Sequence, residues 1–245
     1  MNRPVLLVIA HGSRDPRHAA TVHALVRRAA SLRPGVRVET AFLDFNVPSV
    51  GAVLERLASE GVRDVVALPL LLTRAFHAKA DIPAVLREAP PSLRMRQAPV
   101  LGPSPLLIAA LERRLYEAGL TPADKRSTGV VLASAGSSDP EAIAVIAEMA
   151  RELRHTGWCA VRPAFASASL PRTEDAVRAL REEGARRVAV APYVIAPGRL
   201  PDRIAEGAAG ADVLADVLGP SPELARLLLA RYEEARAEAR GRAAA

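Results

Sequence analysis

The chain has 245 residues, half of them apolar, which suffices for one large α/β domain or two small ones, and its composition gives no sign of disorder. No apolar run reaches the roughly eighteen residues of a membrane span, so we expect no association with a membrane. The 33 lysines and arginines exceed the 27 acidic residues, but aromatic residues make up only 3% and long basic runs are absent, which argues against a nucleic-acid-binding protein.

Two features favour a cytoplasmic protein. A lone cysteine, Cys159, excludes an internal disulfide and suits a reducing compartment. The N-terminus enters an apolar strand directly, without the pattern of a signal peptide. Because Cys159 follows Trp158 at an expected strand start, we expect it in the core rather than in a catalytic role.

Strand and helix patterns alternate along the chain, which is typical of a mostly parallel sheet with right-handed crossovers. The first half predicts strands at 4–10, 37–43, 63–72 and 95–101, and helices at about 16–31, 48–60, 78–88 and 104–118. A polar segment from 120 to 128 is interpreted as a linker. The second half predicts strands at 129–134, 160–166, 186–195 and 212–218, and helices at 140–154, 172–183, 201–208 and 222–240.

The second half repeats the first. The sequence GSRDP that starts at Gly12 matches GSSDP at Gly136, an offset of 124 residues (136 minus 12). The hexapeptide VLGPSP at 100–105 recurs unchanged at 217–222, an offset of 117 (217 minus 100). An identity of this length at matching places indicates a duplication.

We therefore expect an α/β protein of two duplicated lobes. Residues 1–120 form the first lobe and residues 128–245 the second, each with a mostly parallel four-stranded sheet flanked by helices. Two such lobes facing each other would leave a cleft between their strand ends. Since one chain supplies both lobes, we expect a monomer.

Three side chains with useful chemistry follow the predicted strands of the first lobe. His11 follows the first strand, Asp44 the second and His77 the third. Carboxyl ends of parallel strands share one edge of a sheet, where ligands bind in open α/β folds, so we expect these side chains to converge. The second lobe has Ala135 and Ser167 at the matching places, and no histidine matches His77.

A second copy without these residues indicates that folding does not require them. Two imidazoles and a carboxylate suit Fe, Co, Ni or Zn, and histidine also exchanges protons near neutral pH. We therefore expect His11, Asp44 and His77 to have a function. The other histidines, His18, His23 and His155, are predicted to lie on the solvated surface of helices.

Three motifs resemble those of the CbiX/SirB-type sirohydrochlorin chelatases: HGSRDP after a buried strand, FLDFNVPS in place of FLE-x-x-x-PS, and PLLLTRAFHAKADIP. The resemblance covers the whole chain. With its two lobes and degenerate second half, the chain is similar to the long members of this family. These class II chelatases insert cobalt or iron into a modified tetrapyrrole without ATP. The resemblance thus implies a lyase of cobalamin or sirohaem biosynthesis, with Co²⁺ or Fe²⁺, and Ni²⁺ as a further candidate, as the metal substrate.

The resemblance also implies roles for individual residues. His11 and His77 would bind the incoming metal and take protons from the pyrrole nitrogens. Asp44 stands where many members have glutamate, and its shorter side chain leaves open whether it is a direct third ligand.

The eight carboxylates of sirohydrochlorin call for cations and backbone N–H groups near this site. Arg14, Arg74 and Lys79 flank the first-lobe site, so we expect these cations to bind substrate carboxylates, with a solvated surface role as the alternative for each arginine. The turn at Gly12 and Ser13 is expected to let backbone N–H groups approach a carboxylate.

Other functions remain open from the sequence. Asp44 favours a repurposed metal-binding member that acts on another ligand. His-Gly beside Ser and Arg is also found in histidine-dependent phosphoryl enzymes, although these usually have arginine directly before His-Gly, where this chain has Ala10. The chain lacks a P-loop or dinucleotide fingerprint, which argues against an ATP-driven chelatase subunit. The residues do not distinguish iron from cobalt.

Overall fold

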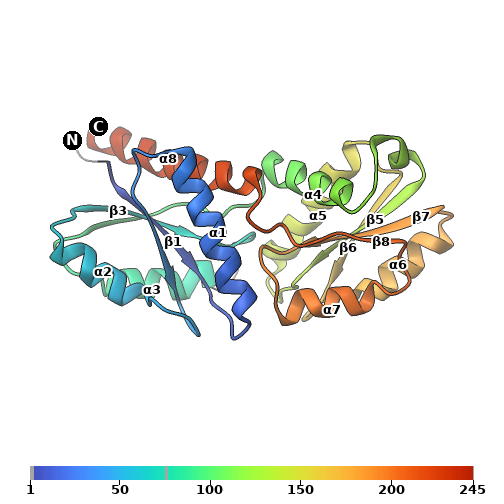
Figure 1. Cartoon of the computed structure of the whole chain (residues 1–245), viewed down its shortest axis with the longest axis horizontal. Coiled ribbons are helices and arrows are strands. Elements are labelled where there is room, and N and C mark those ends of the chain that lie inside the picture. The colour runs from blue at the N-terminus through green and yellow to red at the C-terminus, as the bar shows by residue number, and fades with distance from the viewer. Residues whose placement is uncertain (1–2, 75–76, 245) are drawn as a thin grey trace. The chain divides into compact units, whose positions relative to one another are not determined.

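The computed structural model of the protein describes residues 3–74 and 77–244. For residues 77 and 239–244 it describes the backbone only. It contains two parallel four-stranded sheets, with strand orders β2-β1-β3-β4 and β6-β5-β7-β8, and helices pack on both faces of each sheet (Figure 1). The predicted alternation of strands and helices is confirmed. No helix in the described ranges is both long and apolar enough to cross a membrane.

The first sheet and its connections come from the first hundred residues. Its strands are β1 (Val5–Ala10), β2 (Val38–Phe42), β3 (Asp64–Pro69) and β4 (Arg94–Gln97). The helices between them are α1 (Pro16–Leu32), α2 (Val50–Ser59), the short π-helix η1 (His77–Asp81) and α3 (Ile82–Arg87). The predicted helix at 78–88 thus begins with a π-helical turn.

The second sheet repeats this order. Its strands are β5 (Thr128–Ser134), β6 (Ala160–Phe165), β7 (Arg187–Tyr193) and β8 (Val213–Leu214). The remaining helices are α4 (Pro105–Glu117), the 3₁₀ helix η2 (Pro122–Arg126), α5 (Pro140–His155), α6 (Thr173–Glu182), α7 (Arg199–Gly207) and α8 (Pro222–Ala244). The edge strands β4 and β8 are shorter than predicted. The segment predicted as a linker contains η2.

Strand β1 occupies the middle of the first sheet and is buried along its whole length. Alternate side chains point to opposite faces of a strand, so an apolar run without polar residues requires cover on both faces. Val5, Leu7 and Ile9 pack against the buried residues of α2 and α3. The opposite face is covered by α1 and α8, which pack against each other (Figure 1).

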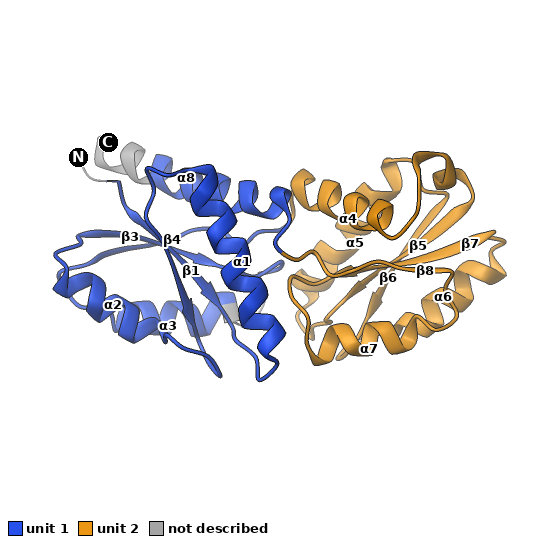
Figure 2. Ribbon diagram, viewed as in Figure 1, with its two compact units in different colours: residues 1–102, 220–245 blue, residues 103–219 orange. Residues whose placement is uncertain are grey.

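The two repeats exchange their last helices. One compact unit consists of residues 1–102 and 220–245, and the other of residues 103–219 (Figure 2). The chain passes from one unit to the other within each copy of VLGPSP, between Gly102 and Pro103 and again between Gly219 and Pro220. Helix α4 therefore covers the second sheet, and α8 covers the first.

Equivalent hydrogen bonds hold the exchanged helices. In the second unit, the Arg114 guanidinium on α4 donates to the carbonyl of Leu218 at 2.9 Å. In the first unit, Arg231 on α8 donates to the carbonyl of Leu101 at 2.9 Å. The Tyr232 hydroxyl adds a hydrogen bond to the carbonyl of Pro4 at 2.7 Å. The compact units thus differ from the expected lobes, 1–120 and 128–245, in the assignment of these two helices.

Gly136 is predicted to be essential for the stability of the second unit. Its φ is +93°, and a Cβ added there would lie 1.9 Å from the carbonyl oxygen of Ser167. Gly136→Ala should therefore destabilise the protein by more than about 1 kcal/mol, measured by urea unfolding.

Gly51 provides the matched control. It lies in α2, and an added Cβ would meet nothing within 4 Å. Gly51→Ala should stabilise the protein by about 0.5–1 kcal/mol, because alanine loses less backbone entropy in a helix. Equal stability of the two variants would contradict this explanation.

Candidate active site

The first unit places its distinctive residues at the carboxyl edge of the sheet. The chain after β2 continues alongside the end of β1, because the N–H of Leu43 donates to the carbonyl of Ala10 at 3.0 Å and that of Asp44 to His11 at 2.9 Å. On the other side of β1, the N–H of Leu70, just after β3, donates to Ile9 at 2.8 Å. The first three parallel strands thus end at one edge of the sheet. The convergence of the side chains of His11, Asp44 and His77 at this edge stays a prediction.

Gly12 allows the first two loops to meet. Its φ is +98°, and an added Cβ would lie 1.9 Å from the carbonyl oxygen of Asp44. One residue further on, the N–H of Ser13 donates to the side-chain oxygen of Asn46 at 2.8 Å. The turn residues therefore join the loop after β1 to the loop after β2.

The second unit builds the same backbone arrangement with other side chains. Ser167 donates from its N–H to the carbonyl of Ala135 at 3.0 Å, and an added Cβ on Gly136 would meet Ser167 as closely as one on Gly12 would meet Asp44. The pairings of His11 with Ala135 and of Asp44 with Ser167 are thus equivalent in three dimensions. The loops adopt this arrangement without an imidazole or a carboxylate, so neither is required for folding.

The His11 imidazole is half-buried and oriented by its own loop. Its Nδ1 lies 3.2 Å from the carbonyl oxygen of Gly12. A carbonyl oxygen only accepts hydrogen bonds, so this contact assigns the proton to Nδ1 and leaves the lone pair on Nε2. That lone pair is the one suited to bind a metal or to accept a proton. The imidazole also lies 6.2 Å from the ring of Phe45, measured between centroids.

The Asp44 carboxylate is exposed at the same edge. One of its oxygens, Oδ1, accepts a hydrogen bond from the N–H of Phe45 at 2.8 Å. This contact fixes the direction of a short side chain and commits part of the carboxylate to the loop. Its second oxygen, Oδ2, takes no part in this hydrogen bond.

His77 begins the π-helix η1, and its side chain lies outside the described residues. Single π-helical turns are often found at functional sites. The described part of the chain contains no group of three or more His, Cys, Asp or Glu side chains that could hold a metal. The trio of His11, Asp44 and His77 therefore stays a prediction.

The predicted substrate-binding cations are all exposed. Arg14 lies with its guanidinium carbon 5.2 Å from the centroid of the Phe45 ring, next to His11. Arg74 follows β3, and Lys79 is in η1. The Ser13 N–H, expected to approach a carboxylate, already donates to Asn46, so Ser13 supports the turn in this structure.

Two histidines are less exposed than predicted. His18 on α1 is half-buried, and its Nδ1 is buried without a described partner. Burial lowers the pKa of His18 below 6.5, and the nearby His11 lowers it further. His23 is half-buried edge-on against Phe42, with centroids 5.6 Å apart. The prediction of a solvated surface is wrong for both, whereas His155 is exposed as predicted.

The repeat distinguishes His18 from a generic surface histidine. The offset of 124 pairs His18 with Ala142, so this histidine also belongs to the first copy alone.

The prediction for Cys159 is wrong as well, because the cysteine is exposed. The adjacent Trp158 has the larger apolar surface, and it is the residue that is buried.

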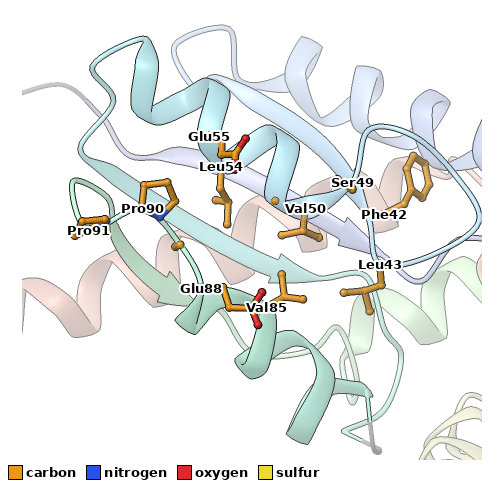
Figure 3. Close-up of a pocket in the computed structure, with 12 residues that line it drawn as sticks. Phe42, Leu43, Ser49, Val50, Leu54, Glu55, Val85, Glu88, Pro90 and Pro91 are labelled. Carbon is orange, nitrogen blue, oxygen red and sulfur yellow. The ribbon is translucent and has the colours of Figure 1, made fainter.

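A separate cavity of about 340 Å³ lies in the first unit. Figure 3 shows Val50 and Leu54 from α2 and Val85 from α3 facing this space, with Glu55 and Glu88 also among the labelled residues. Its described lining includes none of the predicted site residues. The carboxyl edge of the sheet, rather than this cavity, is therefore the candidate active site.

A comparison with protein families identifies the chain. The model of the CbiX family matches residues 5–118 and again residues 129–235, which are the two repeats. The chain belongs to the CbiX family. The family resemblance predicted from the motifs is thus confirmed.

Curated relatives of this CbiX-family chain include proteins for two metals. It is 29% identical to the sirohydrochlorin cobaltochelatase of Priestia megaterium, over 94% of this chain and 79% of that protein. It is 27% identical to the sirohydrochlorin ferrochelatase of Bacillus subtilis (strain 168), over 82% of this chain and 78% of the relative.

Solved structures show the same fold. SirB from Bacillus subtilis, determined with Fe³⁺, has a TM-score of 0.82 at 24% identity and is covered over 98% of both chains. CbiX, described as the terminal enzyme for biosynthesis of sirohaem in denitrifying bacteria, has a TM-score of 0.70 at 21% identity, over 95% of this chain and 99% of that chain. The predicted two-sheet α/β architecture of the long CbiX-family members is thus confirmed.

The burial of His18 predicts a pH-dependent loss of stability. A histidine whose pKa is lowered by folding binds a proton more readily in the unfolded chain, so stability decreases as the pH falls through the ordinary value of 6.5. His18→Gln should reduce the difference in unfolding free energy between pH 7.5 and pH 5.5, measured by urea titration. The exposed His155→Gln variant should keep the wild-type difference. If His18→Gln kept the wild-type difference in unfolding free energy between the two pH values, the attribution of this pH dependence to His18 would be contradicted.

Proposed function

We propose that this protein is a sirohydrochlorin chelatase that inserts Co²⁺ or Fe²⁺ into its tetrapyrrole substrate. Family membership over both repeats supports the activity. The observation that carries the assignment of residues is the contrast between the repeats. His11 and Asp44 stand on a backbone arrangement that the second unit builds with Ala135 and Ser167. Two residues that the common backbone does not need are therefore assigned to the reaction.

In the proposed reaction, His11 first binds the metal substrate. Its Nε2 carries the lone pair, since Nδ1 is turned to the carbonyl of Gly12. His77 and Asp44 supply the other protein ligands, and nitrogen and carboxylate donors together suit both Co²⁺ and Fe²⁺. A ligand set of this kind holds a divalent cation without ATP and releases it to the four nitrogens of a macrocycle.

The same histidines then act as proton acceptors. Insertion of a divalent metal displaces two pyrrole N–H protons, which need bases nearby. A bound cation disfavours protonation of an imidazole, so departure of the metal raises its proton affinity. Each histidine thus becomes a stronger base as the macrocycle takes the metal. The exposed cations Arg14, Arg74 and Lys79 bind substrate carboxylates around the site.

We further propose a monomer that works in the cytoplasm. The duplicated chain supplies both units itself. The lone Cys159 suits a reducing compartment.

Removal of either histidine should abolish most of the activity. His11→Ala and His77→Ala should each lower the rate of sirohydrochlorin metalation by at least about 100-fold, the contribution typical of a positioned acid or base. The measurement is anaerobic metalation followed by absorbance, with Co²⁺, Fe²⁺ and Ni²⁺ offered separately. Ala135→His, which places an imidazole at the equivalent position of the second unit, should leave the rate unchanged.

Three other results would overturn this proposal or part of it. Wild-type protein that does not accelerate metalation with any of the three metals is not a chelatase of sirohydrochlorin. Metal binding without metalation would indicate a repurposed metal-binding member of the family. A full rate in His11→Ala would remove the assignment of that residue.

Asp44 allows a separate test of the third ligand. If its carboxylate binds the metal, Asp44→Ala should weaken Co²⁺ binding about 10-fold or more, the loss expected when a group that supports a metal site is removed. Asp44→Glu, which keeps the charge, should bind better than Asp44→Ala. Ser167→Ala is the control in the second unit. Titration calorimetry with Co²⁺ alone measures all four proteins, and unchanged binding in Asp44→Ala would show that this carboxylate is not a ligand.

A further inference from the structure

The most conspicuous unexplained side chain at the candidate site is Phe45. It has 49% of its surface exposed, and Val47, two residues further along the same loop, has 84% exposed. Both lie in the loop after β2, at the carboxyl edge of the sheet. Single exposed apolar residues are common, so exposure by itself does not indicate a function. The backbone and the contacts of Phe45 provide further evidence.

The backbone at Phe45 is unusual for an aromatic residue. Its φ is +61°, in a region that residues with bulky side chains rarely adopt. Hydrogen bonds of the loop hold it there, because its N–H donates to Asp44 Oδ1 at 2.8 Å and the N–H of Asn46 donates to the Asp44 carbonyl at 2.7 Å. The loop therefore presents the ring at a fixed place.

The second unit shows that this loop does not need an aromatic ring. Ala168 occupies the position of Phe45 and has nearly the same φ, +60°. The N–H of Ser169 donates to the carbonyl of Ser167 at 2.6 Å, as Asn46 does to Asp44. A methyl group is thus sufficient for the loop, so the ring of Phe45 has another purpose.

The ring contacts two groups of the candidate site. Its centroid lies 6.2 Å from that of the His11 imidazole, with 34° between the planes. The guanidinium of Arg14 lies 5.2 Å from it. An apolar aromatic ring therefore lies close to both the proposed metal ligand and an exposed cation. This combination matches a flat conjugated molecule with carboxylates on its rim.

We propose that Phe45 positions the substrate: its ring stacks against the tetrapyrrole beside His11, so that the macrocycle nitrogens approach the metal while Arg14 binds a rim carboxylate. This inference rests on the proposed function and extends it to the surface that recognises the substrate. Phe45 takes no part in the proton transfer. Its contribution is to hold the macrocycle in place.

The test compares Phe45→Ala, Phe45→Leu and Phe45→Trp with the wild-type protein. The control is Leu32→Ala. Leu32 has a similar exposed fraction (47%), but it is the last residue of α1 and is far from the site residues in the sequence. Binding of metal-free sirohydrochlorin is measured by absorbance titration, and KM and kcat by anaerobic metalation with Co²⁺. Co²⁺ binding is measured separately by calorimetry without the tetrapyrrole.

Loss of the ring should weaken substrate binding and leave metal binding unchanged. Phe45→Ala should raise the Kd and KM for sirohydrochlorin about 10-fold, as stacking on an aromatic side chain typically contributes. Phe45→Leu should show most of this loss, because it lacks the aromatic ring even though it keeps apolar surface. Phe45→Trp and Leu32→Ala should bind as the wild type does, and Co²⁺ binding should stay within about 2-fold in all variants.

Three results would overturn the proposal. Substrate binding in Phe45→Ala within 2-fold of the wild type would exclude stacking. A fall in kcat and in Co²⁺ affinity at constant KM would show that the ring supports His11 instead. A dimer that dissociates in Phe45→Ala, seen by sedimentation, would assign the surface to a second copy of the chain.

A second probe separates this proposal from the proposed function. If the wild type does not bind sirohydrochlorin, an octacarboxylate porphyrin is titrated in its place. Binding that is lost in Phe45→Ala would keep the stacking surface while the proposed substrate is rejected. Absence of binding to both molecules would reject both proposals.

Discussion

The candidate site depends on the close approach of the Gly12 backbone to the carbonyl oxygen of Asp44. A side chain at residue 12 would occupy the space that this oxygen fills. The loops after β1 and β2 would then separate, and the hydrogen bonds from Asp44 to His11 and from Ser13 to Asn46 would be lost. The positions of the imidazole, the carboxylate and the Phe45 ring all depend on these contacts. The absence of a single Cβ is thus a condition for the whole arrangement.

The duplication provides a comparison within one molecule. Both units form the same turn, with a glycine at positive φ against a backbone carbonyl and a non-glycine residue at positive φ one position beyond that carbonyl. The side chains on this common backbone differ, with His11, Asp44 and Phe45 in the first unit and small residues in the second. Backbone geometry and chemical function are therefore separable in this fold. The geometry is maintained in both units, whereas the reactive groups occur in one.

Local patterns in the sequence were sufficient to predict the secondary structure and the edge of the sheet that carries the candidate site. Buried apolar strands, turn glycines and helices that start with proline each have a recognisable sequence pattern, and the carboxyl edge follows from parallel strands.

The exchange of α4 and α8 has no such pattern in the sequence. Leu107, Leu111 and Arg114 on α4 correspond to Leu224, Leu228 and Arg231 on α8, so the residue pattern does not indicate which sheet each helix covers. Burial of His18 and exposure of Cys159 depend on packing between elements, which a one-dimensional pattern does not contain. The positive φ of Phe45 was also beyond prediction, since aromatic residues rarely adopt it.

The exchanged helices also determine which of the two units is completed first during synthesis. The ribosome completes residues 103–219, a whole compact unit, before it adds the helix that covers one face of the first sheet. The unit that carries His11 therefore begins first and closes last. Until α8 emerges, the apolar residues on that face of β1 and β3 lack their native cover, and exposed apolar surface of this kind favours aggregation. Translation that stops after the second VLGPSP would yield one complete unit and leave the histidine-bearing unit unfinished.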